Sequence, residues 1–84
     1  MSHINRNRHA IHPENTVDWE AFRERLKNLR TDEGIDRIVL SQLCGMYDKA
    51  VSDYEAGKAL PNAETLARLS DYFMVSVDYL LGRR

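Results

Sequence analysis

LSQLCGMYDKAVSDYEAGK, residues 40–58, predicts two short helices joined by a tight turn. Asp36 can cap the first of these helices, with Leu40 and Leu43 facing inward. Gly45 marks its end, because glycine readily takes the left-handed conformation that follows a helix. We therefore expect a helix of about eight residues that stops where the chain turns.

The second helix of this pair begins at Tyr47 or Asp48, with Val51 and Tyr54 facing inward. Two helices joined by a short turn that contains glycine form a helix-turn-helix, whose second helix is free to lie in the major groove of DNA. The spacing predicts this motif over about residues 36–56.

Three more helices are predicted outside this segment. One spans about residues 17–33 behind a Thr16 cap, one begins at Pro61 and Asn62, and one follows a Ser76 cap. The apolar stripes are Trp19, Phe22, Leu26 and Leu29 in the first, Leu66, Leu69 and Phe73 in the second, and VDYLL in the third. No segment has the alternation of a strand, so we expect an all-α fold of five short helices.

The 84 residues make room for one small domain, and 43% hydrophobic residues are typical of a globular chain. We expect a helix-turn-helix domain at residues 16–82, a flexible polar arm at 1–15 and a short tail at 83–84. The single cysteine, Cys44, permits neither an intrachain disulfide nor a zinc cluster. Without a signal peptide or membrane span, a soluble cytoplasmic protein is expected.

The polar arm leaves two interpretations open. His9 and His12, with His3 upstream, could be considered metal ligands, but no carboxylate or cysteine completes the set, so an arm without metal is favoured. Arg6 and Arg8 could enter a minor groove, although a solvated tail is the preferred interpretation. No catalytic arrangement appears in the sequence, so we expect neither an enzyme nor a cofactor.

The charge of the chain argues against binding to nucleic acid. The formal net charge is −1, and residues 18–82 carry eight basic side chains against twelve acidic ones. Proteins that bind a polyanion usually present a basic surface. Composition by itself therefore points away from DNA.

Residues 22–82 nevertheless resemble the phage-repressor helix-turn-helix family, which includes Cro, cI and the xenobiotic-response-element regulators. The matching blocks, in order, are FRERLKNLR, LSQLCGM, VSDYEAGKALPNAETLARLS and VSVDYLLG. Four blocks in the right order and spacing are far more specific than one glycine between two helices. The resemblance implies a lambda-repressor-like fold and a repressor-like transcriptional regulator that binds double-stranded operator DNA, usually as a homodimer.

The resemblance also assigns roles to residues by position. The recognition helix would span about residues 48–56, and Arg30 and Glu55 match a buried pair that is expected to be structural. The implied DNA contacts are Arg37 and Lys58 toward phosphates, and Asp48, Lys49, Ser52 and Asp53 toward bases. The candidate dimer surface is the fifth helix, with Val75, Val77, Tyr79, Leu80 and Leu81; if that helix only packs in the core, the arm or the first helix could pair instead.

A few residues depart from the family's pattern. Asp48 can accept a hydrogen bond from a cytosine amino group, but is favoured as an N-cap that replaces the cap missing at Tyr47. Asp53 has no such role, so either it contacts cytosine or the surface is not made for DNA. Met74 stands where the family has glycine and is expected to affect only packing.

The acidic third helix keeps a second function open. A protein-interaction module could share this fold and use that helix to bind another protein instead of DNA. Larger relatives continue past the position of Gly82 into a ligand-sensing or dimerisation domain, whereas this sequence has two residues after it. No small-molecule effector domain is therefore expected. DNA binding remains the preferred interpretation.

Overall fold

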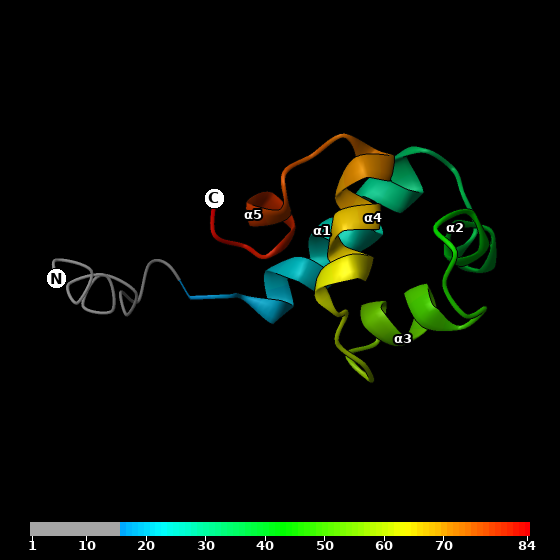
Figure 1. Cartoon of the computed structure of the whole chain (residues 1–84), viewed down its shortest axis with the longest axis horizontal. Coiled ribbons are helices and arrows are strands. Elements are labelled where there is room, and N and C mark those ends of the chain that lie inside the picture. The colour runs from blue at the N-terminus through cyan, green and yellow to red at the C-terminus, as the bar shows by residue number, and fades with distance from the viewer. Residues whose placement is uncertain (1–15) are drawn as a thin grey trace, which may run out of the picture.

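The computed structural model describes residues 16–84, and these fold into helices without a strand. The helices are α1 (Trp19–Asp32), α2 (Arg37–Leu43), α3 (Ala50–Glu55), α4 (Ala63–Phe73) and α5 (Val77–Leu80) (Figure 1). The predicted all-α fold of five short helices is confirmed for this part of the chain. None of these helices is long and apolar enough to cross a membrane. The expectations for the polar arm, with its histidines and arginines, fall on residues 1–15 and lie outside the described residues.

Helix α1 begins two residues later than predicted, because Asp18 caps it and Thr16 does not. The Asp18 carboxylate accepts a hydrogen bond from the Ala21 N–H at 3.0 Å. The Asp18 N–H donates to the Leu81 carbonyl at 2.8 Å. The predicted Thr16 cap is therefore wrong, and the true cap also fastens the start of α1 to the segment after α5.

One apolar core joins all five helices. Its buried side chains include Phe22 and Leu26 of α1, Leu40 of α2, Val51 and Tyr54 of α3, Leu66, Leu69 and Phe73 of α4, and Leu80 of α5. Phe22 and Tyr54 meet edge to face, with 6.2 Å between ring centroids. Burying a side chain of this size contributes about 1.5–3 kcal/mol, so the core can hold helices as short as α3 that would not form alone.

Hydrogen bonds to Ser41 close the turn between α2 and α3. The Ser41 hydroxyl donates to the Arg37 carbonyl at 2.9 Å and accepts the Val51 N–H at 3.0 Å. The Ser41 carbonyl accepts the Met46 N–H at 2.8 Å. Gly45, with φ at +69°, supplies the left-handed residue predicted for this turn. Ser41 is fully buried, and its hydrogen bonds join α2 to α3 across the turn.

Leu43 lies outside the core, against the prediction that it faces inward. Its side chain is 60% exposed, whereas Leu40 is fully buried. Cys44, four residues after Leu40, is buried in its place. Residues four apart share a face of a helical turn, so Cys44 completes the stripe that Leu40 begins and Leu43 turns toward solvent.

Helix α3 begins at Ala50, later than predicted, and its cap position is Lys49. No side chain makes a capping hydrogen bond there. The prediction that Asp48 is the N-cap is therefore wrong. Its carboxylate accepts instead from the Gln42 side-chain amide at 3.3 Å, across the turn.

Ser76 caps α5 as predicted, and Asn62, predicted with Pro61 only as the start of its helix, is the cap of α4. The residue between these helices acts differently from the expectation. Asn62 accepts from the Thr65 N–H at 2.8 Å, and Ser76 accepts from the Tyr79 N–H at 3.0 Å. Met74 ends α4 with φ at +57°, and no other non-glycine residue in the described part has a positive φ. Because its side chain is 90% exposed, the expectation that Met74 affects only packing is wrong. Its effect is on the backbone, in a conformation that favours glycine.

Candidate nucleic-acid interface

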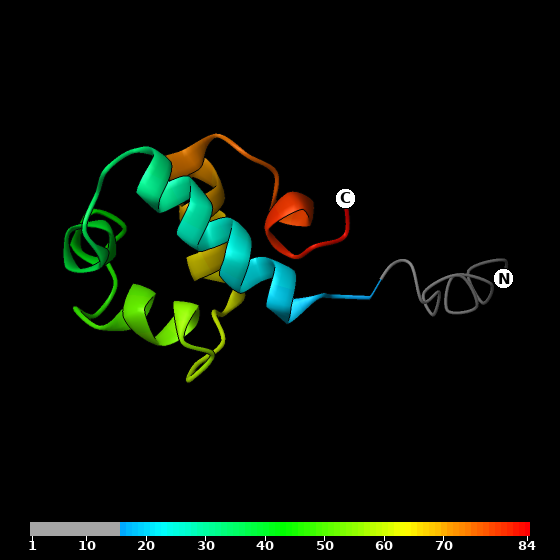
Figure 2. The ribbon, with the colours of Figure 1, turned by 180° about the vertical axis from the view of Figure 1, so that it is seen from behind.

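Helices α2 and α3 form the end of the molecule opposite the C-terminus (Figures 1 and 2). A surface hollow of about 730 Å³ lies along the first residues of both helices. Its lining residues are Arg30, Asp36, Arg37, Ile38, Val39, Asp48, Lys49 and Ser52. Four of the six residues predicted to contact DNA, Arg37, Asp48, Lys49 and Ser52, therefore share one surface.

The other two predicted residues lie beside this hollow. Asp53 is half-buried on α3, and Lys58 is exposed in the segment that follows the helix. The Lys58 N–H donates to the Asp53 carbonyl at 2.8 Å. This backbone bond keeps the two residues together at the C-terminal side of the interface.

Both aspartates of the predicted recognition helix accept a hydrogen bond from a neutral side chain. Gln42 donates to Asp48 at 3.3 Å, and the Tyr47 hydroxyl donates to Asp53 at 3.2 Å. Desolvation, together with the hydrogen bond and charge of Asp53, raises the pKa of Tyr47 above its ordinary value. Each of these bonds uses one oxygen of its carboxylate, at Asp48 in the turn before α3 and at Asp53 on α3 itself.

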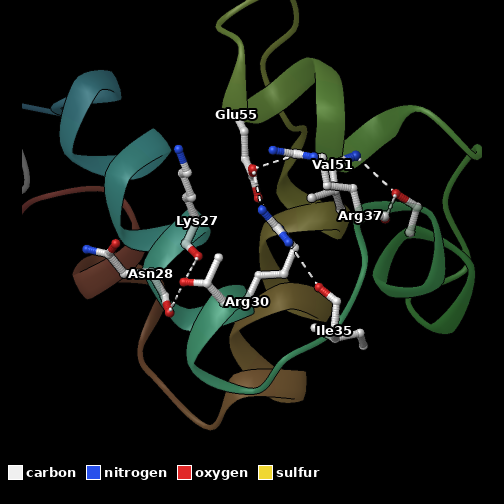
Figure 3. Close-up of polar contacts among 9 residues, drawn as sticks. Lys27, Asn28, Arg30, Ile35, Arg37, Val51 and Glu55 are labelled. Atoms are coloured by element: carbon white, nitrogen blue, oxygen red, sulfur yellow. Dashed lines mark hydrogen bonds and ion pairs between the residues drawn. The ribbon is translucent and has the colours of Figure 1, made fainter.

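A buried carboxylate joins the three helices around the interface (Figure 3). Glu55 of α3 accepts from Arg30 of α1 through Nε at 2.6 Å and Nη2 at 3.0 Å. It also accepts from Nε of Arg37, on α2, at 3.1 Å. Arg30 donates in addition to the Ile35 carbonyl at 3.0 Å. The hydrogen bond to Glu55 is the largest cause that raises the pKa of Arg30, and the 2.6 Å contact shows that the predicted Arg30–Glu55 pair is present.

The two arginines on this carboxylate differ in exposure. The side chains of Arg30 and Glu55 are 8% and 5% exposed, whereas that of Arg37 is 49% exposed. Breaking a buried pair by removing one partner costs about 3–5 kcal/mol, so loss of Arg30 or Glu55 should destabilise the fold. Arg37 instead lies at the edge of the hollow, half in solvent, with only its Nε used by Glu55.

Two apolar residues of the hollow were not singled out by the sequence pattern. Ile38 and Val39 of α2 are 54% and 43% exposed. The sequence did contain a signal for them. Ile38, Val39 and Leu40 are consecutive in a seven-residue helix, and only one side of such a helix faces the core, so not all three can be buried. Exposed apolar side chains beside polar ones can contact thymine methyl groups.

The hollow has a different charge balance from the domain around it. Its lining contains three cationic side chains, Arg30, Arg37 and Lys49, and two acidic ones, Asp36 and Asp48. Glu55 offsets the charge of Arg30, which leaves the surface close to neutral and not strongly basic. Residues 16–84 contain no group of three or more His, Cys, Asp or Glu side chains that could hold a metal ion.

The helix-turn-helix family model HTH_3 matches residues 26–80, which include the whole interface. The chain is 40% identical over 60 residues to the SPbeta prophage-derived uncharacterized HTH-type transcriptional regulator YonR of Bacillus subtilis (strain 168). It is 37% identical over 61 residues to the HTH-type transcriptional activator BcrR of Enterococcus faecalis. These alignments cover 71% and 73% of this chain, but only 56% and 30% of the two relatives.

Solved structures show the same arrangement of helices. The P22 c2 repressor protein, in complex with a synthetic operator, superposes with a TM-score of 0.70 and 32% identity, over 75% of this chain and 96% of that one. The restriction-modification controller protein C.AhdI from Aeromonas hydrophila gives a TM-score of 0.67 and 25% identity, with the same coverage of 75% and 96%. The likeness thus extends over nearly the full length of both solved chains.

Proposed function

The chain belongs to the helix-turn-helix family HTH_3, and on this basis we propose that it is a repressor-like transcriptional regulator that binds operator DNA through α2 and α3. The observation that carries the proposal is the shared surface of Arg37, Asp48, Lys49 and Ser52. That surface belongs to the fold in which the P22 c2 repressor protein was solved with a synthetic operator. The proposal includes a cytoplasmic location, where such DNA is accessible, and no catalytic activity.

The exposed side chains have proposed roles that follow from their chemistry. Lys49, exposed at the start of α3, would donate to the N7 and O6 acceptors of guanine. Ser52, one turn further along the helix, carries a hydroxyl that can bond to a base or to a neighbouring phosphate. Arg37 and Lys58 would contact phosphates on the two sides of the groove and so position the helix without reading sequence.

The two aspartates give the proposed interface its specificity. A carboxylate is repelled by phosphates and by guanine acceptors, but it can accept from the amino group of cytosine. Gln42 and Tyr47 hold Asp48 and Asp53 at the surface without neutralising them. An acidic recognition helix is therefore compatible with DNA when the operator presents cytosine at the facing positions.

We propose that the active form is a homodimer, because one recognition helix reaches only a few base pairs. Helix α5 remains the candidate dimer surface, although Leu80 is fully buried and serves the core. Tyr79 is 36% exposed, and Val77 and Leu81 are half-buried beside it. These three side chains, with Val75, are the part of the candidate surface that a second copy could contact.

The protein-interaction alternative would use the same fold with a protein partner on α3. The comparisons do not favour it, because the relatives are named transcriptional regulators and one structural neighbour was solved with an operator. The alternative predicts no affinity for duplex DNA at any salt concentration. That expectation separates the two functions.

Fluorescence anisotropy tests the proposal, with a duplex from the protein's own promoter region and a random duplex of equal length. We expect binding to the promoter duplex at low salt. With about four phosphate contacts per dimer, the affinity should fall roughly hundredfold between about 50 and 200 mM salt. If neither duplex binds at the lower salt concentration, the regulator function is refuted and the protein-interaction function takes its place.

A further inference from the structure

We propose that Lys27, Arg37 and Ser52 form a seat for one backbone phosphate of duplex DNA, in which Glu55 is the positioning residue for Arg37. The seat rests on the proposed function, because its ligand is a phosphodiester of the bound duplex. These residues, with Ala56, line a hollow of about 190 Å³ that adjoins the larger one and shares Arg37 and Ser52 with it. The three proposed contacts come from three helices, Lys27 from α1, Arg37 from α2 and Ser52 from α3.

The local charge at this hollow favours an anion. Glu55 accepts from Arg30 with both oxygens and from Arg37 with one, so two guanidinium groups meet one carboxylate. Lys27 adds a further positive charge on the rim. Three cationic side chains, Arg30, Arg37 and Lys27, therefore surround one carboxylate, Glu55, at this hollow.

The bond between Arg37 and Glu55 determines where the rest of the guanidinium points. A guanidinium is planar and rigid, so fixing Nε fixes the directions of both Nη groups. Glu55 is buried and cannot itself face DNA, while Arg37 is half-exposed. Glu55 thus holds Arg37 from behind and leaves its Nη donors for an acceptor from outside.

Lys27 approaches the same place from α1. Figure 3 shows its side chain extending toward the side on which Glu55 and Arg37 meet. A phosphate bound there would receive a fork of two N–H groups from Arg37, one ammonium charge from Lys27 and one hydroxyl hydrogen from Ser52. Arginine and lysine are the side chains that best complement phosphate oxygens.

The first test compares Lys27→Gln with Arg84→Gln. Both variants are titrated with a random duplex, so that sequence-specific base contacts do not contribute to the measured affinity. Arg84 is a matched control, because its side chain is 77% exposed and it lies at the C-terminus, at the far end from α2. For each bound copy, Lys27→Gln should weaken binding about fivefold to tenfold at about 0.1 M salt and lower the salt slope by about 0.9. Arg84→Gln should change the affinity less than twofold.

Equal losses in Lys27→Gln and Arg84→Gln would overturn the seat while leaving the regulator function intact. Failure of the unmodified protein to bind any duplex would overturn both. The two failures are therefore distinguishable in one titration series.

The second test asks whether Glu55 acts through Arg37. Arg37→Gln, Glu55→Gln and the double variant are compared for DNA affinity, with circular dichroism and thermal melting to confirm folding. If Glu55 positions Arg37, Glu55→Gln should weaken binding severalfold in the native background and no further when Arg37 is already glutamine. Equal losses in both backgrounds would show that Glu55 is only structural.

Arg37→Lys keeps the positioning claim testable if Glu55→Gln does not fold. Lysine retains the charge but not the rigid fork of donors. We expect a similar salt slope with about threefold weaker binding. An affinity equal to that of the unmodified protein would overturn the positioning role of Glu55.

Discussion

Lys49 and Lys58 carry the same charge near opposite ends of α3, but only Lys49 borders the large hollow. Lys49→Ala should weaken binding to the operator by about 1–3 kcal/mol, relax preference at one base pair and affect random DNA little. Lys58→Ala should weaken binding to both kinds of duplex alike. Anisotropy titrations with an operator selected from a random pool, and with its single-base variants, measure the difference. If Lys49→Ala lowers the affinity for both duplexes equally, Lys49 contacts a phosphate and not a base.

The charge of Asp53 opposes phosphates if this residue faces the groove. Asp53→Asn should therefore strengthen binding to random duplex a fewfold and weaken discrimination for cytosine. Asp71→Asn is the matched control, since Asp71 is exposed on α4 and lies outside the interface. If both variants bind random duplex with the same affinity, Asp53 lies away from the DNA.

Met74 has a left-handed backbone conformation, which disfavours any residue with a side chain. A non-glycine residue in the left-handed region costs about 1–2 kcal/mol. Replacing it with glycine removes this strain, but glycine has more conformational freedom to lose on folding, which offsets part of the gain. Met74→Gly should thus raise the free energy of unfolding by about 0.5–1 kcal/mol, measured by urea denaturation. Met74→Ala is the control, because it removes the exposed side chain but keeps the strain. A gain in Met74→Ala equal to that in Met74→Gly would assign the effect to the side chain.

At the level of the elements, the turn between α2 and α3 depends on space as well as backbone conformation. Gly45 and Gly34 have nearly the same φ, +69° and +67°. A Cβ at Gly45 would lie 2.9 Å from the Arg68 guanidinium, whereas a Cβ at Gly34 would meet nothing within 4 Å. Arg68 donates to the carbonyls of Cys44 and Gly45 at 3.1 and 3.2 Å, so the new methyl group would displace it from the turn.

Both glycine-to-alanine changes should therefore destabilise the domain by about 1–2 kcal/mol through backbone strain. Gly45→Ala should lose about 1 kcal/mol more, through the hydrogen bonds of Arg68. Urea denaturation of the two variants gives the difference directly. Equal losses would mean that Arg68 moves aside at no cost.

The elements that the sequence predicts well are those with local signals. Asn62 and Ser76 cap their helices with bonds to residues three positions on, and such spacing is visible in one dimension. The choice between Leu43 and Cys44 for the core depends on how α2 packs, which its own seven residues do not determine. The Arg37–Glu55 contact joins residues 18 positions apart, so only the tertiary fold reveals it. The same holds for the seat proposed around Lys27.

For the whole molecule, affinity is limited by the number of cations that one copy can bring to DNA. Residues 18–82 carry more acidic than basic side chains, and each phosphate contact contributes separately to binding. A second copy doubles the contacts and adds a second recognition helix. Dimerisation is therefore the simplest way for a nearly neutral interface to reach useful specificity.

The candidate dimer surface can be tested at Tyr79, whose ring stacks under Arg25 at 4.3 Å and is 36% exposed. Losing such an exposed contact costs about 0.5–1 kcal/mol within one copy, so Tyr79→Ser should still fold. If α5 forms the interface, Tyr79→Ser should raise the dimer dissociation constant at least tenfold in sedimentation equilibrium and reduce the steepness of operator binding. Leu60→Ser, which removes a 62% exposed side chain between α3 and α4, should leave both quantities unchanged. The reverse result, with dimers lost in Leu60→Ser and kept in Tyr79→Ser, would move the interface from α5 to the segment before α4.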